Sequence, residues 1–190
     1  MRWQDIGDMT CSIARALSVV GDRWTLLILR DAFLRTRRFE DFQASLGITR
    51  HRLADRLRKL VDNGILERVP YQQRPARYEY RLTEKGRDLY PVIVSLVSWG
   101  DRWMAGKAGP PIELVHRDCG HHITPVLSCP DCGVPIAARD MRARPGPALR
   151  KREASVVKHV LSPVEGRISS KSGSGKAPTR YASRGTLHDR

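Results

Sequence analysis

The stretch that decides the fold is Phe39-Glu-Asp-Phe-Gln-Ala-Ser-Leu-Gly-Ile-Thr-Arg-His-Arg-Leu-Ala-Asp-Arg-Leu-Arg-Lys-Leu-Val-Asp-Asn-Gly64. It predicts a short helix, a glycine turn and a longer basic helix. Phe39, Phe42 and Leu46 recur at i, i+3 and i+7, so they form one apolar stripe on the short helix. Gly47 can adopt a positive φ and end that helix sharply.

The longer helix, expected over Thr49–Asn63, has two distinct faces. Thr49 is a candidate N-cap, and Asn63 or Gly64 ends the helix. At about 100° per residue, one side carries Leu53, Leu57 and Leu60, bordered by Val61. The opposite side carries His51, Asp55, Arg58 and Asp62, flanked by Arg52 and Lys59. The pattern predicts a DNA-reading helix, whose N-terminal half meets base edges; the alternative is the solvated basic face of an ordinary helix.

Two more helices are expected before this unit. Cys11–Val20 has an apolar stripe and Thr10 as its cap. Gly21 breaks that helix, and Asp22 caps the next, Arg23–Leu34, which is apolar over much of its circumference and therefore belongs in the core. A short basic link, 35–38, follows and could form a brief strand.

Two strands, Ile65–Pro70 and Tyr78–Leu82, are predicted after the helix pair. The polar, proline-stiffened segment between them has Gln72–Arg77 as its tip, which makes a hairpin. A hairpin in this position predicts a wing that lies along phosphates or enters the minor groove. The alternative is a plain surface hairpin.

Residues Thr83–Met104 are expected to be helical, with Pro91 kinking or dividing the helix. Apolar residues recur at helical spacing over a face broader than a winged-helix core needs. Because excess apolar surface usually marks an interface, this region and the first helix are predicted to pair with a second copy, which presents two reading helices to a pseudo-palindromic site. The alternative is a helix folded fully onto its own domain.

A zinc-ribbon pattern follows the linker 106–111. The four candidate ligands are His116, Cys119, Cys129 and Cys132, arranged as two short knuckles, each with glycine after its second ligand. Tetrahedral zinc prefers thiolates and imidazoles delivered in this way. Four protein ligands close a site, so the metal would be structural. His121 or His122 could replace His116, and a metal-free hairpin with reduced cysteines is the alternative.

Composition indicates a polyanion as partner. The net charge is +14 and the pI about 10.4. The tail from Arg142 to Arg190 holds twelve Lys and Arg against three Asp and Glu. Its low-complexity, cationic composition predicts disorder and salt-sensitive, non-specific DNA affinity.

Other classes of protein are disfavoured. No signal peptide is expected, and the apolar run 92–99 is too short to span a bilayer. The spacing of the cysteines suits a reducing cytosol and a metal site rather than a disulfide framework. No nucleophile elbow, phosphate-binding glycine loop or paired carboxylates in an apolar context indicate an enzyme.

Residues of about 9–105 together resemble the HxlR-type winged-helix transcriptional regulators, which are relatives of the MarR group. The resemblance rests on Cys11, Gly21-Asp-Arg-Trp-Thr-Leu-Leu-Ile-Leu-Arg, Arg38-Phe-Glu-Asp-Phe, Leu46-Gly-Ile, Leu53-Ala-Asp-Arg-Leu-Arg-Lys-Leu, Gly64-Ile-Leu-Glu-Arg, Tyr78-Glu-Tyr-Arg-Leu-Thr-Glu-Lys-Gly and Trp99-Gly-Asp-Arg-Trp. It implies a dimeric bacterial regulator that binds operator DNA through the second helix of the helix-turn-helix and the wing.

The resemblance also singles out Cys11. Some regulators of this type respond to quinones, aldehydes or oxidants through a cysteine near this position. A thiolate in the first turn of a helix is favoured by the helix dipole, and Arg15 lies one turn on. The alternative is a small side chain packed in the dimer interface.

The sequence therefore predicts a mainly α protein with a small β-hairpin wing. The expected parts are a winged-helix DNA-binding and dimerisation domain over 1–105, a zinc-ribbon-like extension over 106–141 and a basic disordered tail over 142–190. The expected function is that of a cytoplasmic, nucleoid-associated repressor, released from its operator by a small reactive molecule or oxidant. The alternative is a zinc-containing interaction module that recruits a transcription partner, with secondary non-specific DNA binding. The predicted DNA contacts are Thr49, Arg50, His51, Arg52, Asp55, Arg56, Arg58, Lys59, Gln73, Arg74 and Arg77.

Overall fold

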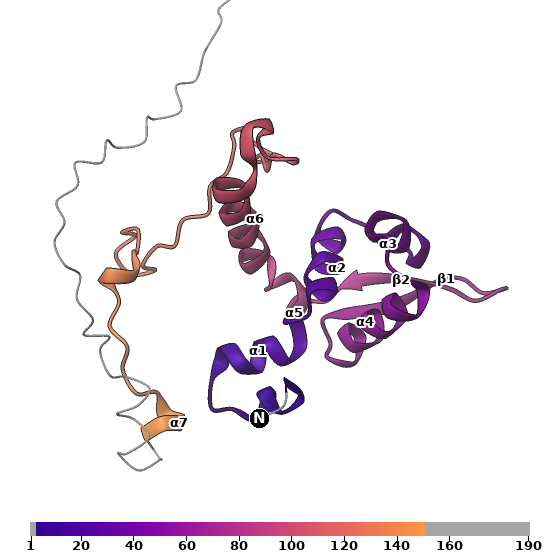
Figure 1. Cartoon of the computed structure of the whole chain (residues 1–190), viewed down its shortest axis with the longest axis horizontal. Coiled ribbons are helices and arrows are strands. Elements are labelled where there is room, and N and C mark those ends of the chain that lie inside the picture. Colours follow the sequence, from indigo (N-terminus) through magenta and orange to yellow (C-terminus); the bar gives the residue numbers. More distant parts are fainter. Residues whose placement is uncertain (1–2, 151–190) are drawn as a thin grey trace, which may run out of the picture.

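A computed structural model describes residues 3–150, and Figure 1 shows its elements. The helices before the sheet are η1 (Trp3–Asp8, a 3-10 helix), α1 (Ser12–Val20), α2 (Arg23–Phe33), α3 (Phe39–Leu46) and α4 (Arg50–Asp62). The antiparallel pair β1 (Leu66–Gln72) and β2 (Arg77–Leu82) follows. The later elements are α5 (Glu84–Arg87), α6 (Tyr90–Met104), the 3-10 turns η2 (Gly106–Ala108) and η3 (Ala138–Asp140), and α7 (Pro147–Arg150). The predicted disordered tail lies mostly outside the described residues.

The helix-turn-helix has the predicted boundaries. Gly47, at φ 59°, ends α3 in the left-handed conformation. Thr49 occupies the N-cap position of α4, although its side chain makes no capping hydrogen bond. Asn63 is the C-cap, and Gly64 follows at φ 66°. Local turn chemistry therefore sets the ends of the helix whose outer face carries the candidate DNA contacts.

Helix α2 lies in the middle of the fold and contacts α3, α4, α6 and β2. Its N-cap is Asp22, as predicted, and the carboxylate accepts from the backbone N–H groups of Trp24 and Thr25 at 3.0 and 3.4 Å. The largest fully buried hydrophobic side chains are Phe42, Ile28, Leu29, Leu53, Leu57, Leu60 and Leu66. These residues come from α2, α3, α4 and β1, so one core holds the helix-turn-helix against the sheet.

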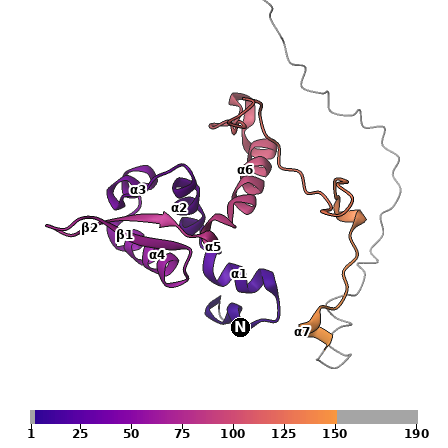
Figure 2. The same cartoon turned by 180° about the vertical axis from the view of Figure 1, so that it is seen from behind.

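The wing is the β1–β2 hairpin with its tip residues 73–76. The strands pair in register from Leu66↔Leu82 to Pro70↔Tyr78, and an irregularity between Pro70 and Gln72 precedes the tip. The wing projects away from the helices in Figures 1 and 2. At its base, a Cβ added to Gly86 would lie 2.2 Å from the carbonyl oxygen of Ile65, so α5 approaches the α4–β1 turn closely.

The predicted helical region 83–104 is divided into α5 and α6. The break precedes Pro91, which lies in the first turn of α6, where its missing N–H leaves no hydrogen bond unmade. Ile93 and Val94 face the core. The other side of α6 leaves Val92 and Leu96 each 48 % exposed, Trp99 55 % and Trp103 65 %.

Helix α1 begins one residue later than predicted. Cys11, not Thr10, is its N-cap, and the helix proper starts at Ser12. Two of its apolar residues, Ile13 and Leu17, are exposed. Both α1 and α6 lie on the side of the molecule opposite to the wing tip in Figures 1 and 2. The exposed apolar side chains are therefore separated from the basic wing.

The extension after α6, predicted as a zinc-ribbon-like β segment, contains two small hairpins. Each is held by an isolated bridge, Val115↔His122 in the first hairpin and Ser128↔Pro135 in the second. Since each hairpin closes around a tight turn and pairs with nothing further, its bridge does not extend into a strand. Within residues 3–150, no helix is long and apolar enough to cross a membrane.

Candidate nucleic-acid interface

The outer face of α4 carries the predicted DNA-reading side chains. His51, Arg52 and Arg58 are exposed, and Asp55 is half-buried between them. The inner face is filled by Leu53, Leu57 and Leu60, which are all 0 % exposed. The amphipathic pattern therefore orients the helix with its polar side toward solvent, as the sequence predicted.

Asp55 links the polar groups on this face. One carboxylate oxygen accepts from Arg58, one turn on, and the other lies 3.5 Å from the His51 imidazole, one turn before. Arg58 thus has its guanidinium held along the helix rather than free in solvent. This pairing favours the predicted role of Asp55 in orienting a neighbouring arginine.

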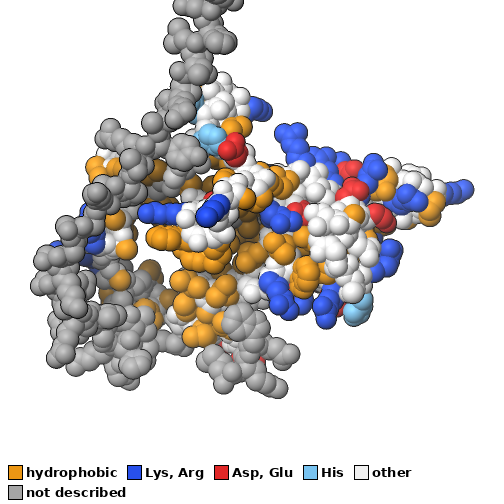
Figure 3. Space-filling model, turned by 45° about the horizontal axis from the view of Figure 1, so that its top comes forward, with side chains coloured by type: hydrophobic (Ala, Val, Ile, Leu, Met, Phe, Trp, Pro, Cys, Tyr) orange, Lys and Arg blue, Asp and Glu red, His pale blue; other side chains and the backbone are white. Residues whose placement is uncertain are grey.

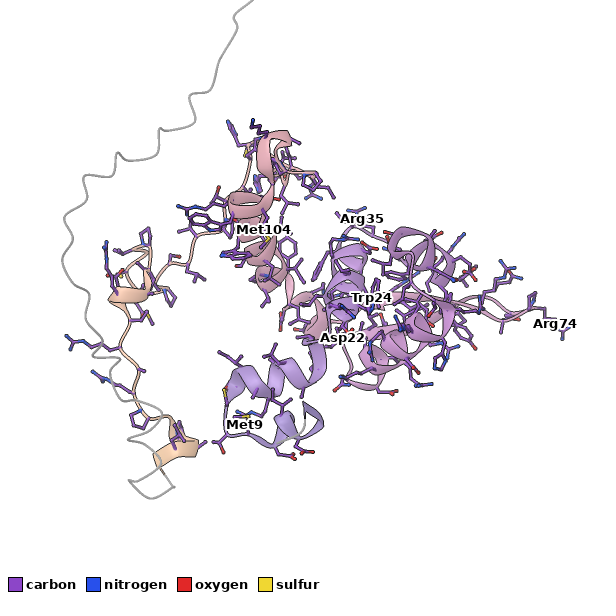
Figure 4. All side chains as sticks on the ribbon, viewed as in Figure 1. Met9, Asp22, Trp24, Arg35, Arg74 and Met104 are labelled. Atoms are coloured by element: carbon purple, nitrogen blue, oxygen red, sulfur yellow. The ribbon has the colours of Figure 1, made fainter. Side chains whose placement is uncertain are left out.

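Two residues predicted to anchor phosphates have intramolecular partners instead. The guanidinium Nε of Arg56 donates to Asp22 at 3.0 Å, and the ammonium Nζ of Lys59 donates to the Ser18 carbonyl oxygen at 2.7 Å. Both side chains therefore connect α4 to the junction between α1 and α2. Figure 4 shows Asp22 at this junction. Both residues lie on one side of α4, between its buried leucines and its outer face, and side chains there reach the neighbouring helices.

Arg50 begins α4 and lies over the ring of Phe39, with its guanidinium carbon 4.9 Å from the ring centroid. Such a cation–π contact holds the side chain in place while leaving charge available to a phosphate. Thr49, directly before it, is exposed. The start of α4 therefore keeps both predicted contact residues on the surface, at the positive end of the helix dipole.

The predicted wing residues Gln73, Arg74 and Arg77 are all exposed. Arg74 lies at the outer end of the wing in Figure 4. The Gln72 side chain donates to the Arg74 carbonyl oxygen at 3.0 Å and closes the tip. Two arginines are therefore exposed at the tip, on a short turn that this hydrogen bond stabilises.

Three arginines around Glu79 were not among the residues predicted to contact DNA. Arg81 approaches this carboxylate within 3.0 Å, and Arg37 and Arg38 each lie at 4.0 Å. Arg38 also lies over the Tyr71 ring, 4.8 Å from its centroid. One acid among three arginines leaves excess positive charge beside the wing. The basic run 35–38 was the available signal, and its bridge to Glu79 places it against β2.

Positive charge gathers on one half of the molecule in Figure 3, over the winged helix and the wing. Hydrophobic side chains gather beside that half. The separation of the two kinds of surface suits a protein that binds a polyanion at one side and another apolar surface at the other.

The four predicted metal ligands lie in two pairs. His116 Nδ1 is 3.2 Å from the sulfur of Cys119. In the second hairpin, the sulfur of Cys129 accepts from the backbone N–H groups of Cys132 and Asp131 and from the Cys132 thiol, and these hydrogen bonds lower the pKa of Cys129. Among residues 3–150, no group of three or more His, Cys, Asp or Glu side chains forms a metal-sized cluster.

Cys11 is half-buried at the N-cap position of α1. It therefore lies just outside the first turn in which it was predicted. The Arg15 guanidinium, expected near the thiol, approaches the Ser12 hydroxyl at 3.5 Å. The backbone places Cys11 at the positive end of α1, and no observation in the structure assigns it a sensing role.

Comparison with known proteins identifies the family. The HxlR-like helix-turn-helix family matches residues 19–108. An uncharacterised HTH-type transcriptional regulator of Mycobacterium tuberculosis is 51 % identical over 144 residues, covering 76 % of this chain and 91 % of the relative. The chain belongs to the HxlR-like helix-turn-helix family. The resemblance drawn from the sequence is thereby confirmed, and the proteins of this family are DNA-binding transcriptional regulators rather than enzymes.

Solved structures support the same assignment. The crystal structure of PA1607, described as a candidate transcription factor, has a TM-score of 0.66 and 40 % identity over 73 % of this chain and 96 % of its own. PA1374 from Pseudomonas aeruginosa has a TM-score of 0.54 and 38 % identity, covering 80 % of this chain and all of that one. The 144 residues matched in the mycobacterial regulator exceed the 105 residues expected for the winged-helix domain, so that match continues into the extension.

Proposed function

We propose that this HxlR-like regulator is a repressor that binds a pseudo-palindromic operator as a homodimer in the bacterial cytoplasm. The observation that carries the proposal is the outer face of α4. It presents exposed His51, Arg52 and Arg58 on a helix whose inner face is fully buried. A helix fixed in this way can enter a major groove as a rigid element.

Base contacts come from His51, Asp55 and Arg58. Arginine donates two hydrogen bonds to guanine, and a carboxylate accepts from a cytosine amino group. The Arg58–Asp55 pair matches adjacent G and C edges, because the carboxylate holds the guanidinium and keeps one face toward the groove. A pre-positioned arginine loses less conformational freedom on binding than a free one.

Phosphate contacts flank the reading face. Arg50 and Arg52 at the start of α4, with Gln73, Arg74 and Arg77 on the wing, provide donors on both sides of it. Arg56 and Lys59 are assigned instead to holding α4 in place, because their donors are already engaged with Asp22 and Ser18. Thr49 contacts a phosphate through its hydroxyl, which makes no capping hydrogen bond.

The exposed apolar faces of α1 and α6 support the homodimer. Trp99, Trp103 and Leu96 lie along one side of α6, and Ile13 lies exposed on α1. Contiguous apolar surface of this kind is characteristic of a protein interface. Since α1 and α6 lie on the side of the molecule opposite to the wing tip, two copies joined through these helices keep both reading helices free for DNA.

The test is operator affinity of Arg58→Ala against wild type, with sites first located by genome-wide occupancy mapping. Loss of a base-reading arginine is expected to cost about 1–3 kcal/mol, roughly a 5- to 150-fold weaker Kd, and to relax sequence preference at one position. The matched control is Arg139→Ala, an exposed arginine in the extension. An unchanged Kd and footprint for Arg58→Ala would remove this residue from the reading set.

Release by a reactive small molecule rests on Cys11. Its half-exposed thiol lies at the N-terminal end of α1, one of the proposed dimer helices. A modified thiol there would alter the dimer and, through it, the spacing of the reading helices. An oxidant or quinone is expected to release wild-type protein from the operator and to leave Cys11→Ser bound; equal release of both would exclude Cys11 as the sensor.

A second candidate function belongs to the extension, which would recruit a transcription partner. The observation in its favour is exposed apolar surface in the second hairpin and its approach, namely Val126, Leu127 and Val134. Comparison of the full chain with a truncation at Gly106 discriminates the two functions. Unchanged operator affinity in the truncated protein would mean that the extension does not contribute to DNA binding, as expected if it recruits a partner. A large loss of affinity would mean that the extension contributes to DNA binding.

A further inference from the structure

The two hairpins of the extension are built alike. In the first, the N–H groups of His116, Gly120 and Ile123 donate to the carbonyl oxygens of His121, His116 and Leu114 at 2.8, 2.7 and 2.9 Å. In the second, the N–H groups of Cys129, Gly133 and Ile136 donate to those of Val134, Cys129 and Leu127 at 2.9, 2.8 and 2.8 Å. Each residue of the second set lies 13 positions after its counterpart in the first, as Cys129 does after His116. The chain therefore repeats one hydrogen-bonded turn.

Each turn brings two side chains of metal-binding type together. The glycine after the second side chain has a positive φ, 71° at Gly120 and 70° at Gly133, which closes the turn back on its first residue. As a result, His116 lies beside Cys119, with 3.2 Å between Nδ1 and Sγ. In the second turn, the Gly133 N–H donates to the Cys129 carbonyl oxygen at 2.8 Å, which closes the chain around Cys129 and Cys132 in the same way.

The repeat also decides between the histidines. His116 occupies the position that Cys129 holds in the second hairpin, whereas His121 and His122 correspond to Val134 and Pro135, which cannot bind a metal. The His122 ring faces the Glu113 carboxylate at 3.4 Å. Both observations select His116 as the nitrogen ligand.

Packing alone does not account for these turns. Cys119 and Cys132 are exposed, and each hairpin has a single bridge. An isolated hairpin is at best marginally stable in water. Small units that lack a core are commonly stabilised by a structural metal, whose binding energy serves as folding energy.

We propose that the two turns bind one Zn²⁺ through the His116 imidazole and the thiolates of Cys119, Cys129 and Cys132. Three sulfurs and one nitrogen form a closed tetrahedral set that zinc favours, so the site is structural. The ion joins the two hairpins, which hold their ligands as separate pairs within residues 3–150. Only residues 124–126 separate Ile123 from Leu127, so the second hairpin begins within about 14 Å of the first, which permits closure.

The test is metal analysis of the purified full-length protein. We expect about one zinc ion per chain in the wild type. Cys132→Ser is expected to lose the bound metal, because removing a ligand costs more than the roughly 10- to 100-fold loss of affinity seen for outer-shell partners. Two controls, Cys11→Ser and His121→Ala, are expected to keep the full zinc content.

A second measurement does not depend on any variant. Co²⁺ added to metal-free wild-type protein is expected to saturate at one equivalent, with the intense thiolate-to-metal absorption of a tetrahedral, sulfur-rich site. Zinc content below about one tenth per chain together with no such absorption would overturn the proposal. Full retention of zinc by Cys132→Ser, or its loss from His121→Ala, would overturn the assigned ligand set.

Discussion

Helices α4 and α6 are both amphipathic, but they use their apolar faces differently. In α4, Leu53, Leu57 and Leu60 are fully buried, and all exposed residues are polar or small. In α6, only Ile93 and Val94 are buried, while Trp99 and Trp103 remain more than half exposed. The apolar face of α4 is buried within its own domain, whereas much of the apolar surface of α6 remains exposed.

The difference shows how one chain can separate two kinds of recognition. A helix that reads DNA needs a rigid inner face, because the positions of its outer side chains must not vary. A helix that pairs with a second copy needs apolar side chains left outside. Replacements on the two helices should therefore affect different measurements.

The largest effect is expected from Leu57→Ala. Truncation of a fully buried leucine costs about 3–4 kcal/mol in unfolding free energy, because it removes buried methyl groups and leaves a cavity. Urea denaturation measures the loss. Leu96→Ala on α6 is the matched control and, at a concentration where the protein is monomeric, should cost under about 1 kcal/mol. Equal losses would contradict the contrast between the two helices.

The next effect is expected from Trp99→Asp, which places a charge on the exposed apolar face of α6. Burying that charge in the proposed dimer should cost at least about 2 kcal/mol, or roughly 30-fold in the dimer Kd. Sedimentation equilibrium measures the shift toward monomer. Trp99→Phe, which keeps an apolar ring, should remain largely dimeric. If the Trp99→Asp variant dimerises with the same Kd as the wild type, the dimer interface lies elsewhere.

Replacing two glycines by alanine compares the packing at the α4–β1 turn with the packing around α6. In Gly86→Ala the new methyl group would lie 2.2 Å from the Ile65 carbonyl oxygen, so a loss of about 2 kcal/mol is expected. Gly100 lies within α6, and a methyl group added there would meet no atom of a neighbouring element within 4 Å. Gly100→Ala should therefore raise stability by about 0.5–1 kcal/mol. Thermal unfolding of both variants tests whether the α4–β1 turn is tightly packed and α6 open.

A smaller loss than that of Gly86→Ala is expected from Asp22→Ala. This change removes the N-cap of α2 and the partner of Arg56, at a cost of about 1–2 kcal/mol. Asp22→Asn keeps a capping oxygen and should lose less. Chemical denaturation orders the variants, and equal stability of Asp22→Ala and wild type would show that neither contact contributes.

Much of this organisation could be predicted because it is local. The spacing of Leu53, Leu57 and Leu60 defines the inner face of α4, and Gly47 marks the turn before it. The partners of Arg56 and Lys59 could not be predicted, since they lie 34 and 41 positions away in the sequence. The spacing of residues along a helix shows on which face a side chain lies, but it does not show which distant helix that side chain contacts.

The same limit applies to the basic surface and to the extension. Glu79 lies near Arg37 and Arg38 because the 35–38 link runs beside β2. The order of residues in the sequence does not reveal this proximity. The four candidate metal ligands were predictable as two knuckles from their spacing. Their separation into two hairpins, linked by residues 124–126, is visible only in three dimensions.

The contacts from Arg56 to Asp22 and from Lys59 to Ser18 have a mechanical consequence. They fasten α4 at two points to the end of α1 and the start of α2. In the proposed dimer, these two contacts couple the orientation of α1 in each protomer to the orientation of α4. The distance between the half-sites in that proposed dimer therefore depends on the joint where α1 meets α2.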